Sequence, residues 1–129
     1  MERVDVAELV AGRGLIGNAD QGGWRQITII DEDAWRQATA ELGVDVNPAA
    51  RRANVMIRGL DLESSRGRQL VLGDCVVNIR GESLPCRLMD QAQAGLQKAL
   101  KQHWRGGIFG EIVRGGRIRA GDPVAFDPL

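Results

Sequence analysis

The chain has 129 residues, of which 43% are hydrophobic and 26% charged, and its formal net charge is zero. That size and composition are typical of one globular domain, here residues 1–129, with enough apolar material for a core. Because no apolar run approaches the ~20 residues of a membrane helix and no signal peptide is visible, we expect a cytoplasmic protein without a membrane span. The two cysteines, Cys75 and Cys86, have no metal-ligand spacing, so we expect a reducing compartment and no metal site.

The net charge of zero conceals an uneven distribution. Residues 1–50 contain four arginines against nine acidic residues, whereas residues 51–119 contain eleven arginines and two lysines against six acidic residues. Arginine presents a planar fork of donors that matches phosphate and carboxylate groups, so the second half suits an anionic ligand. The alternative is that these arginines are surface residues that bind nothing. The absence of a basic run interleaved with aromatic residues argues against nucleic-acid binding.

The first half of the chain predicts a loop, a strand and a helix in succession. The glycine-rich segment 12–18 indicates a loop, and its spacing is not that of a dinucleotide-binding turn. A β-like run over residues 26–30 precedes a helix that we expect to begin after Asp31, a common N-cap residue, and to end at Gly43. A further strand is expected over residues 55–58.

Polar side chains gather at the entrance of the strand over residues 55–58. Arg51, Arg52 and Asn54 supply guanidinium and amide donors, and such donors can hold an anion. Salt bridges to the acidic first half are the alternative use of the same arginines. The residues alone leave both uses open.

The two cysteines have different surroundings in the sequence. Cys75 alternates with Val77 and Ile79 on the apolar face of a strand predicted over residues 74–80, so we expect it in the core. Cys86 follows Pro85, whose ring fixes the backbone, and precedes Arg87, whose charge favours a thiolate. Cys86 is therefore the candidate reactive thiol, and an inert free thiol in a loop is the alternative.

The last third of the chain predicts a second helix and a β-hairpin. Apolar residues at helical spacing indicate a helix over residues 90–104, with a capping box at its start and the only histidine, His103, near its end. Residues 114–117 predict a hairpin turn after a strand over 108–113. Many short strands and two helices indicate a mainly β (α+β) fold, a distorted β-barrel of mostly antiparallel strands with two peripheral helices.

An ordered series of short motifs resembles the MOSC domain, the C-terminal domain of molybdenum cofactor sulfurases, over about residues 12–124. The motifs are Arg51-Arg52-Ala53-Asn54-Val55, Gly59-Leu60-Asp61-Leu62, Leu72-Gly73-Asp74, Pro85-Cys86, Arg105-Gly106-Gly107-Ile108 and Gly115-Gly116-Arg117-Ile118-Arg119-Ala120-Gly121-Asp122.

The resemblance implies a β-barrel, a cofactor of the molybdopterin type, and a cysteine, here Cys86, that carries sulfur as a persulfide. Arg52, Asn54, Arg87 and Arg105 would then face the anionic cofactor. A cysteine desulfurase or another persulfide donor would be one partner, and a molybdoenzyme or its cofactor the acceptor. The chain has no room for the pyridoxal-phosphate domain of the larger sulfurases, so we expect no pyridoxal phosphate on this chain.

Two other functions remain open on the sequence. The first is cofactor-dependent reductive detoxification of N-hydroxylated compounds, which likeness to cofactor-dependent relatives suggests. The second is a non-catalytic binding module in which Cys86 has no chemical role.

Overall fold

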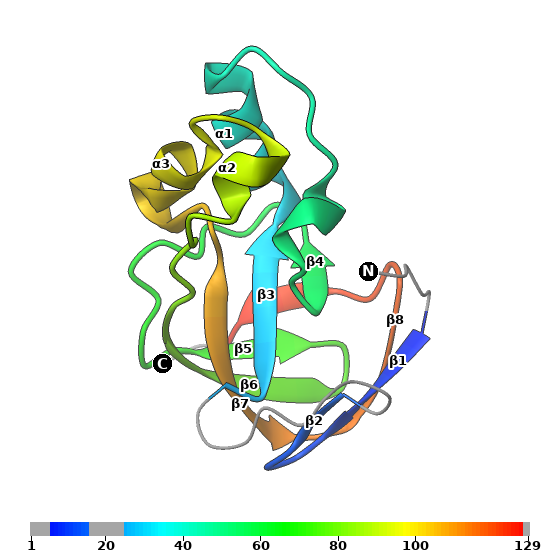
Figure 1. The fold of residues 1–129 in the computed structure, drawn as a ribbon. Helices are drawn as coiled ribbons and strands as arrows, with labels where there is room; N and C mark the ends of the chain where they lie inside the picture. Colours follow the sequence, from blue (N-terminus) through cyan, green and yellow to red (C-terminus); the bar gives the residue numbers. More distant parts are fainter. Residues whose placement is uncertain (1–5, 16–24, 128–129) are drawn as a thin grey trace.

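The structure is a computed structural model that describes residues 6–15 and 25–127, and most of these residues lie in or between short strands (Figure 1). The strands are β1 (Val6–Val10), β2 (Gly14–Leu15), β3 (Ile27–Asp31), β4 (Val55–Ile57), β5 (Gln69–Leu72), β6 (Cys75–Glu82), β7 (Ile108–Arg114), β8 (Gly116–Arg119) and β9 (Val124–Phe126). The helices are α1 (Glu32–Glu41), α2 (Met89–Ala92) and α3 (Leu96–Lys101), with 3₁₀ turns η1 (Pro48–Arg51) and η2 (Gln102–Trp104).

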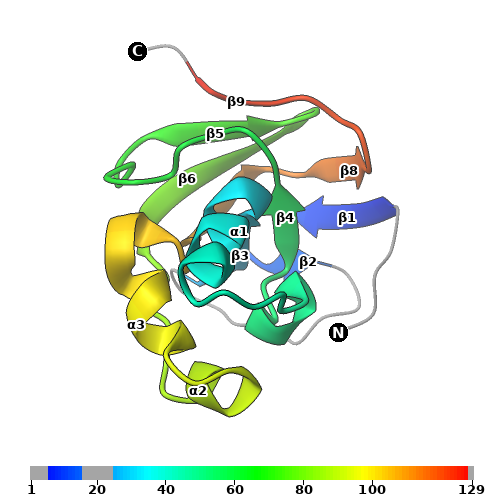
Figure 2. The same ribbon diagram turned by 90° about the horizontal axis from the view of Figure 1, so that it is seen from above.

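The strands form two sheets that curve around a common core. The larger sheet has the order β4-β3-β7-β6-β5-β9, and the smaller has the order β2-β1-β8. Within the described residues, β3 and β4 are the one parallel pair, and the other pairs are antiparallel. Seen from above in Figure 2, the six-stranded sheet is nearly closed. The prediction of a mainly β, barrel-like fold is confirmed.

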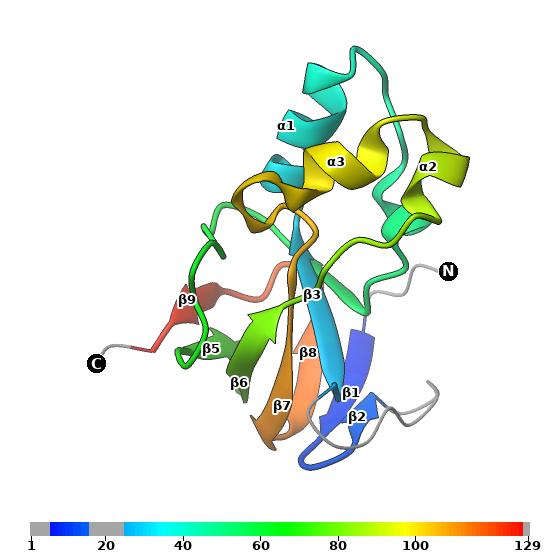
Figure 3. The same cartoon turned by 60° about the vertical axis from the view of Figure 1, so that its left-hand side comes forward.

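Two groups of buried apolar side chains stabilise this arrangement. Alternate residues of the strands fill the barrel, including Ile27, Ile79 and Ile108, each fully buried. Trp35 of α1 packs with Leu96 and Leu100 of α3 in a second cluster. The helices therefore gather at one end of the strands, as Figure 3 shows. No helix within the described part of the chain is long and apolar enough to span a bilayer.

The first helix follows the sequence prediction closely. The Asp31 carboxylate accepts hydrogen bonds from the backbone N–H groups of Asp33 and Ala34, as an N-cap should. Gly43, with φ of +68°, follows the helix directly and takes the left-handed conformation that glycine tolerates. The capping of α1 is thus confirmed at both ends.

The predicted helix over residues 90–104 is broken into two helices and a kinked turn. Gly95 has φ of +87° and precedes α3 as its N-cap residue. Asp90 does not close a local capping box, because its Oδ1 accepts from the N–H of Gln97 in α3. His103 and Trp104 also have positive φ, of 55° and 57°, so the helical path ends before them. The helical spacing was correct, but backbone reversals at these points end each segment.

Two loop predictions were also wrong. Residues 114–117 do not close a hairpin, because β8 pairs with β1, from Val6↔Arg119 to Leu9↔Gly116, instead of returning along β7. Gly115 allows this crossing, since a Cβ there would lie 2.4 Å from the carbonyl oxygen of Leu9. Within the segment 12–18, residues 14 and 15 form β2 against β1, whereas residues 16–18 lie outside the described residues.

Candidate functional site

Cys86 lies in the loop that connects β6 to α2, and its side chain is exposed. The loop begins at Ser83, whose N–H donates to the carbonyl of Gly107 at 2.9 Å. Pro85 is buried, and the carbonyl of Cys86 accepts from the N–H of Met89 at 3.0 Å, at the start of α2. The thiol therefore stands on a loop that is anchored on both sides. Cys75 by contrast is fully buried, as predicted.

Two arginines meet at Ser83, three residues before the thiol. Arg51, at the end of η1, donates from Nη2 to the carbonyl oxygen and to Oγ of Ser83, at 2.8 and 3.0 Å. Its Nε donates to the carbonyl of Gly106 at 3.0 Å. Arg25, just before β3, donates from Nη2 to the same Ser83 Oγ at 3.2 Å. A buried serine thus joins two guanidinium groups from distant parts of the sequence.

No carboxylate of a described residue neutralises the positive charge of this pair. None of the salt bridges between described residues includes Arg25 or Arg51. Burial lowers the pKa of Arg51, while the nearby Cys86 acts in the opposite direction and Arg25 adds to the lowering. Arg51 therefore lies within electrostatic range of both Arg25 and Cys86. A bound anion would relieve the repulsion between the two guanidinium groups.

The basic surface continues from Arg25 along the outside of the sheet. The Arg25 guanidinium lies over the Phe109 ring, 5.0 Å from its centroid. A Cβ at Gly81 would lie 3.3 Å from both Phe109 and Nη2 of Arg66, so a third cation borders the same ring. The arginine pair and the ring together offer charge and a flat apolar surface to a ligand.

Asn54 has one end of its amide fixed and the other end available. Its Oδ1 accepts from the N–H and the hydroxyl of Thr28, at 2.9 and 3.1 Å. Thr28 lies opposite Phe109 in the β3–β7 ladder, which places Asn54 on the same part of the sheet. No hydrogen bond from Asn54 Nδ2 to a described residue is found, so this amide nitrogen is available as a donor.

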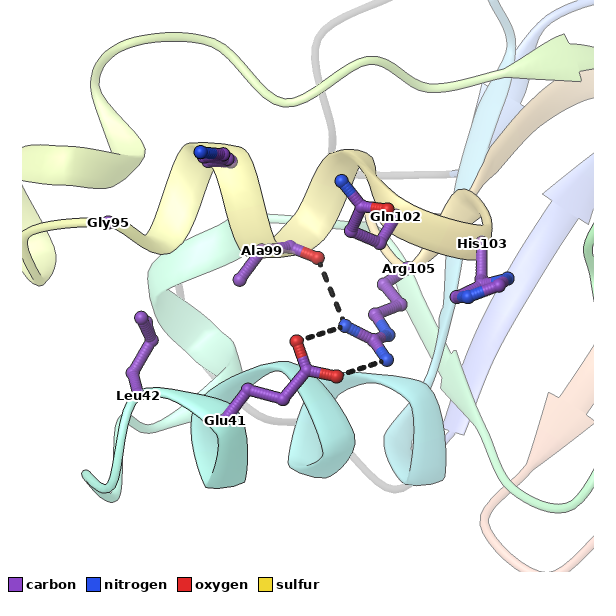
Figure 4. A pocket seen from close by; sticks show the side chains of 8 residues that line it. Glu41, Leu42, Gly95, Ala99, Gln102, His103 and Arg105 are labelled. Atoms are coloured by element: carbon purple, nitrogen blue, oxygen red, sulfur yellow. Dashed lines mark hydrogen bonds and ion pairs between the residues drawn. The ribbon is translucent and has the colours of Figure 1, made fainter.

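The other residues predicted for the site have different surroundings. Arg52 and Arg87 are exposed, and neither forms a salt bridge within the described part of the chain. Arg105 is only 6% exposed, and it donates to both carboxylate oxygens of Glu41, at 2.9 and 2.7 Å, and to the carbonyl of Ala99 (Figure 4). Ligand contact by Arg52, Asn54, Arg87 and Arg105 stays a prediction, and the donors of Arg105 are already largely occupied.

No metal or Cys–His arrangement accompanies the thiol. Among the described residues, no group of three or more His, Cys, Asp or Glu side chains is placed to hold a metal ion. His103 pairs through Nδ1 with Glu63 at 3.0 Å. Cavities of about 440 and 580 Å³ both include His103 and Arg105 in their walls, and neither includes Cys86. The thiol therefore lies outside both cavities and within electrostatic range of Arg51.

Sequence reasoning proposed Cys86 but not the arginine pair at Ser83. Arg51 was considered as one of three possible anion-binding donors but was not among the residues expected to contact a ligand, and Arg25 and Ser83 were not considered as site residues. The one sequence signal for this site was that Arg51 and Arg52 are adjacent, and their adjacency does not indicate which side chain points into the protein. Arg52 has φ of 61° at the end of η1, and it is exposed while Arg51 is partly buried.

Comparison with known proteins supports the fold and identifies the family. The YuaD protein of Bacillus subtilis matches with a TM-score of 0.78 and 21% identity, over 95% of this chain and 85% of that one. YiiM of Escherichia coli matches with a TM-score of 0.72 and 18% identity, over 98% of this chain and 64% of that one. YiiM of Geobacillus stearothermophilus matches with a TM-score of 0.66 and 22% identity, over 81% and 55%.

This chain thus spans 55% and 64% of the two YiiM chains. No curated protein matches by sequence. Residues 18–125 match the MOSC domain family, and this range includes the thiol, the arginine pair and Asn54. The chain belongs to the MOSC domain family.

Proposed function

We propose that Cys86 is the reacting group of this molybdenum-cofactor-associated domain, and that it carries sulfur as a persulfide for delivery to an acceptor. The observation that supports the proposal is the exposed thiol beside Arg51 and Arg25, which have no carboxylate partner among the described residues. Sulfur exchange requires an accessible thiolate, and a fixed positive charge nearby favours the anion over the neutral thiol.

The proposed reaction is a displacement at sulfur without net oxidation. The Cys86 thiolate attacks the terminal sulfur of a donor persulfide, so a bond forms to Cys86 Sγ and the donor's sulfur–sulfur bond breaks. The donor leaves as a thiolate, and the transferred sulfur keeps its proton. In the second step an acceptor nucleophile attacks that terminal sulfur, and Cys86 leaves as a thiolate.

The residues beside Cys86 also fit an anionic cofactor of the molybdopterin type. Arg25 and Arg51 would hold its phosphate, and the free amide nitrogen of Asn54 would donate a further hydrogen bond. Such a cofactor supplies redox chemistry and a sulfur-accepting metal centre when it is bound. The acceptor would then be the cofactor itself or a molybdoenzyme that contains it.

The sulfur has to come from a partner protein or a small persulfide. The only lysines, Lys98 and Lys101, are exposed on α3, and we do not assign pyridoxal phosphate to either of them. We therefore propose a cysteine desulfurase or an equivalent persulfide donor as the source, in the reducing environment of the cytoplasm.

Mass spectrometry after incubation with glutathione persulfide tests the carrier function. The peptide that contains Cys86 should gain about 32 Da, one sulfur atom, and lose it again on treatment with dithiothreitol. Cys86→Ser should show no gain, whereas the control Cys75→Ala should load like the wild type, because Cys75 is buried in the core. If the Cys86 peptide of the wild-type protein gains no sulfur from glutathione persulfide or from a protein persulfide donor, the carrier function is wrong.

A second candidate function is the reduction of N-hydroxylated compounds by a resident molybdenum cofactor. The lack of a carboxylate partner for Arg25 and Arg51 among the described residues favours it, because a permanently bound anion would neutralise that pair. Metal analysis and pterin fluorescence of the freshly purified protein separate the two functions. Stoichiometric molybdenum and pterin would support the reductase, and their absence would count against it. Ligand binding unchanged in Cys86→Ala would instead support a non-catalytic binding module.

A further inference from the structure

Two leucines beside the thiol are the most solvent-exposed of the large hydrophobic side chains among the described residues. Leu84 is 65% exposed and Leu88 is 55% exposed, compared with 44–50% for Val6, Met56 and Val113. They lie two residues on either side of Cys86. Four residue steps span at most about 14 Å, so both leucines fall within the area that a protein bound over the thiol would cover.

The loop holds these leucines outward instead of allowing them to fold into the core. Pro85 and Met89, which lie on either side of the exposed residues 86–88, are buried and anchor the loop to the body of the protein. A scattered exposed leucine is ordinary, but two within one anchored loop form an apolar patch around the reactive atom. Because the anchors already fix the loop, a partner would lose little entropy in ordering it.

The leucine patch is not suited to binding a small anionic ligand. Leucine offers no hydrogen-bond donor, and the small persulfide or cofactor phosphate is served by Arg25 and Arg51. Protein interfaces, in contrast, combine an apolar centre with a charged rim. Arg87 lies within the leucine patch, and it is exposed without a salt bridge to any described residue. Arg52 is also exposed and unneutralised, next to η1, which packs against α2.

We propose that Leu84, Leu88 and Arg87 form a docking surface for a protein that delivers sulfur from its own cysteine persulfide. This partner presents apolar side chains to the two leucines and acidic side chains to the arginines. The proposal rests on the carrier function of Cys86 and names the kind of donor. Docking would bring the partner's persulfide to Cys86 and hold it there while the donor's sulfur–sulfur bond breaks. Charge complementarity to Arg87 and Arg52 is the reason to expect acidic residues on the partner.

The test compares a protein donor with a small one. The protein donor is a purified cysteine desulfurase, charged with L-cysteine and then freed of it, and the small donor is glutathione persulfide. Transfer to Cys86 is followed by mass spectrometry in the wild type and in the double variant Leu84→Ser, Leu88→Ser. We expect the double variant to lose about tenfold in rate with the desulfurase and to react normally with glutathione persulfide.

Two further variants separate docking from general effects of surface change. Val113→Ser also replaces an exposed hydrophobic side chain with serine, at a residue that is 50% exposed. Val113 lies near the end of β7 away from Gly107, to which the Cys86 loop is hydrogen-bonded, so both rates should be unchanged. Arg87→Glu should slow the desulfurase reaction, and salt should slow the wild type in the same way, because added ions screen the attraction.

Each contrary outcome has a distinct meaning. If the double variant keeps the wild-type rate with the desulfurase, or if the wild type takes sulfur from glutathione persulfide alone, the docking proposal is wrong and the carrier function stands. If neither donor loads Cys86, the carrier function fails and the docking proposal fails with it. If sedimentation shows a wild-type dimer that the double variant abolishes, a second copy of the chain covers the patch and the donor assignment is wrong.

Discussion

Substitutions of Arg51 should separate the effect of its charge on the Cys86 thiol from the effect of its hydrogen bonds on stability. Its guanidinium donates to two main-chain carbonyls, of Ser83 and Gly106, and to the Ser83 hydroxyl. Arg51→Met removes the charge and the donors but keeps an extended apolar side chain. Arg51→Lys keeps the charge but lacks the planar fork that reaches two acceptors at once.

The expected losses follow from these three hydrogen bonds. Ser83 and Gly106 are both buried, so the methionine variant leaves carbonyl acceptors without their donor, at a cost of about 2–3 kcal/mol in the free energy of unfolding. For a chain of this size that corresponds to a fall of about 7–11 °C in Tm. The cation beside Cys86 is lost as well, and a partly screened charge at short range is worth about 1 kcal/mol, or about fivefold in the rate of an anionic attack.

Two assays on three proteins test this reasoning. Urea unfolding should rank the stabilities as wild type, then Arg51→Lys, then Arg51→Met. Sulfur uptake by Cys86 from glutathione persulfide, measured below the unfolding transition, should be near normal in Arg51→Lys and about fivefold slower in Arg51→Met. Equal uptake in the wild type and the methionine variant would refute the electrostatic role of Arg51, whatever the stabilities are.

Three further substitutions test other parts of the structure. Burial, with a smaller contribution from Glu63, raises the pKa of Glu82 above 4.5, so the folded state favours the protonated carboxyl and loses stability as the pH rises through that folded pKa. Glu82→Gln should therefore raise the urea midpoint at pH 7 and have no such effect below pH 4.5. Arg105→Met should lower the unfolding free energy by about 2 kcal/mol through loss of the bonds to Glu41 and Ala99, and a thermal melt measures this. Gly107→Ala should cost about 3 kcal/mol or more, because φ is +95° and its Cβ would lie 2.2 Å from the carbonyl of Ile29. The control Gly59→Ala, with φ of +82° and open space around it, should cost about 1 kcal/mol.

The features that sequence reasoning predicted correctly are those set by nearby residues. Alternation along β6 placed Cys75 on the buried face, and Asp31 followed by a helical pattern predicted the N-cap of α1. The exposure of Cys86, which the sequence left open, agrees with its place between a strand and a helix, directly after a proline. In each case the deciding interaction spans only a few residues, so its pattern can be read without knowledge of the fold.

The wrong or missing predictions involve partners far apart in the sequence. Residues 114–117 have the composition of a hairpin turn, but β8 pairs with β1, about 110 residues earlier in the chain. The helical spacing predicted one helix over residues 90–104, whereas Gly95, with φ of +87°, separates two helices. The meeting of Arg25 and Arg51 at Ser83 depends on how η1, β3 and β6 are arranged in the barrel, and no local pattern records that arrangement.

Other arginines of this protein differ from Arg25 and Arg51 in the groups that hold them. Two arginines that stabilise this fold have a carboxylate partner: Glu41 accompanies the buried Arg105, and Glu32 accompanies Arg58. Arg51 and Arg25 are instead held by carbonyl and hydroxyl oxygens, which position a guanidinium without cancelling its charge. Keeping two positive charges together beside an exposed thiol is unfavourable unless an anion completes the group. The arrangement therefore favours a site that receives negative charge, which both the thiolate of a sulfur carrier and an anionic cofactor would provide.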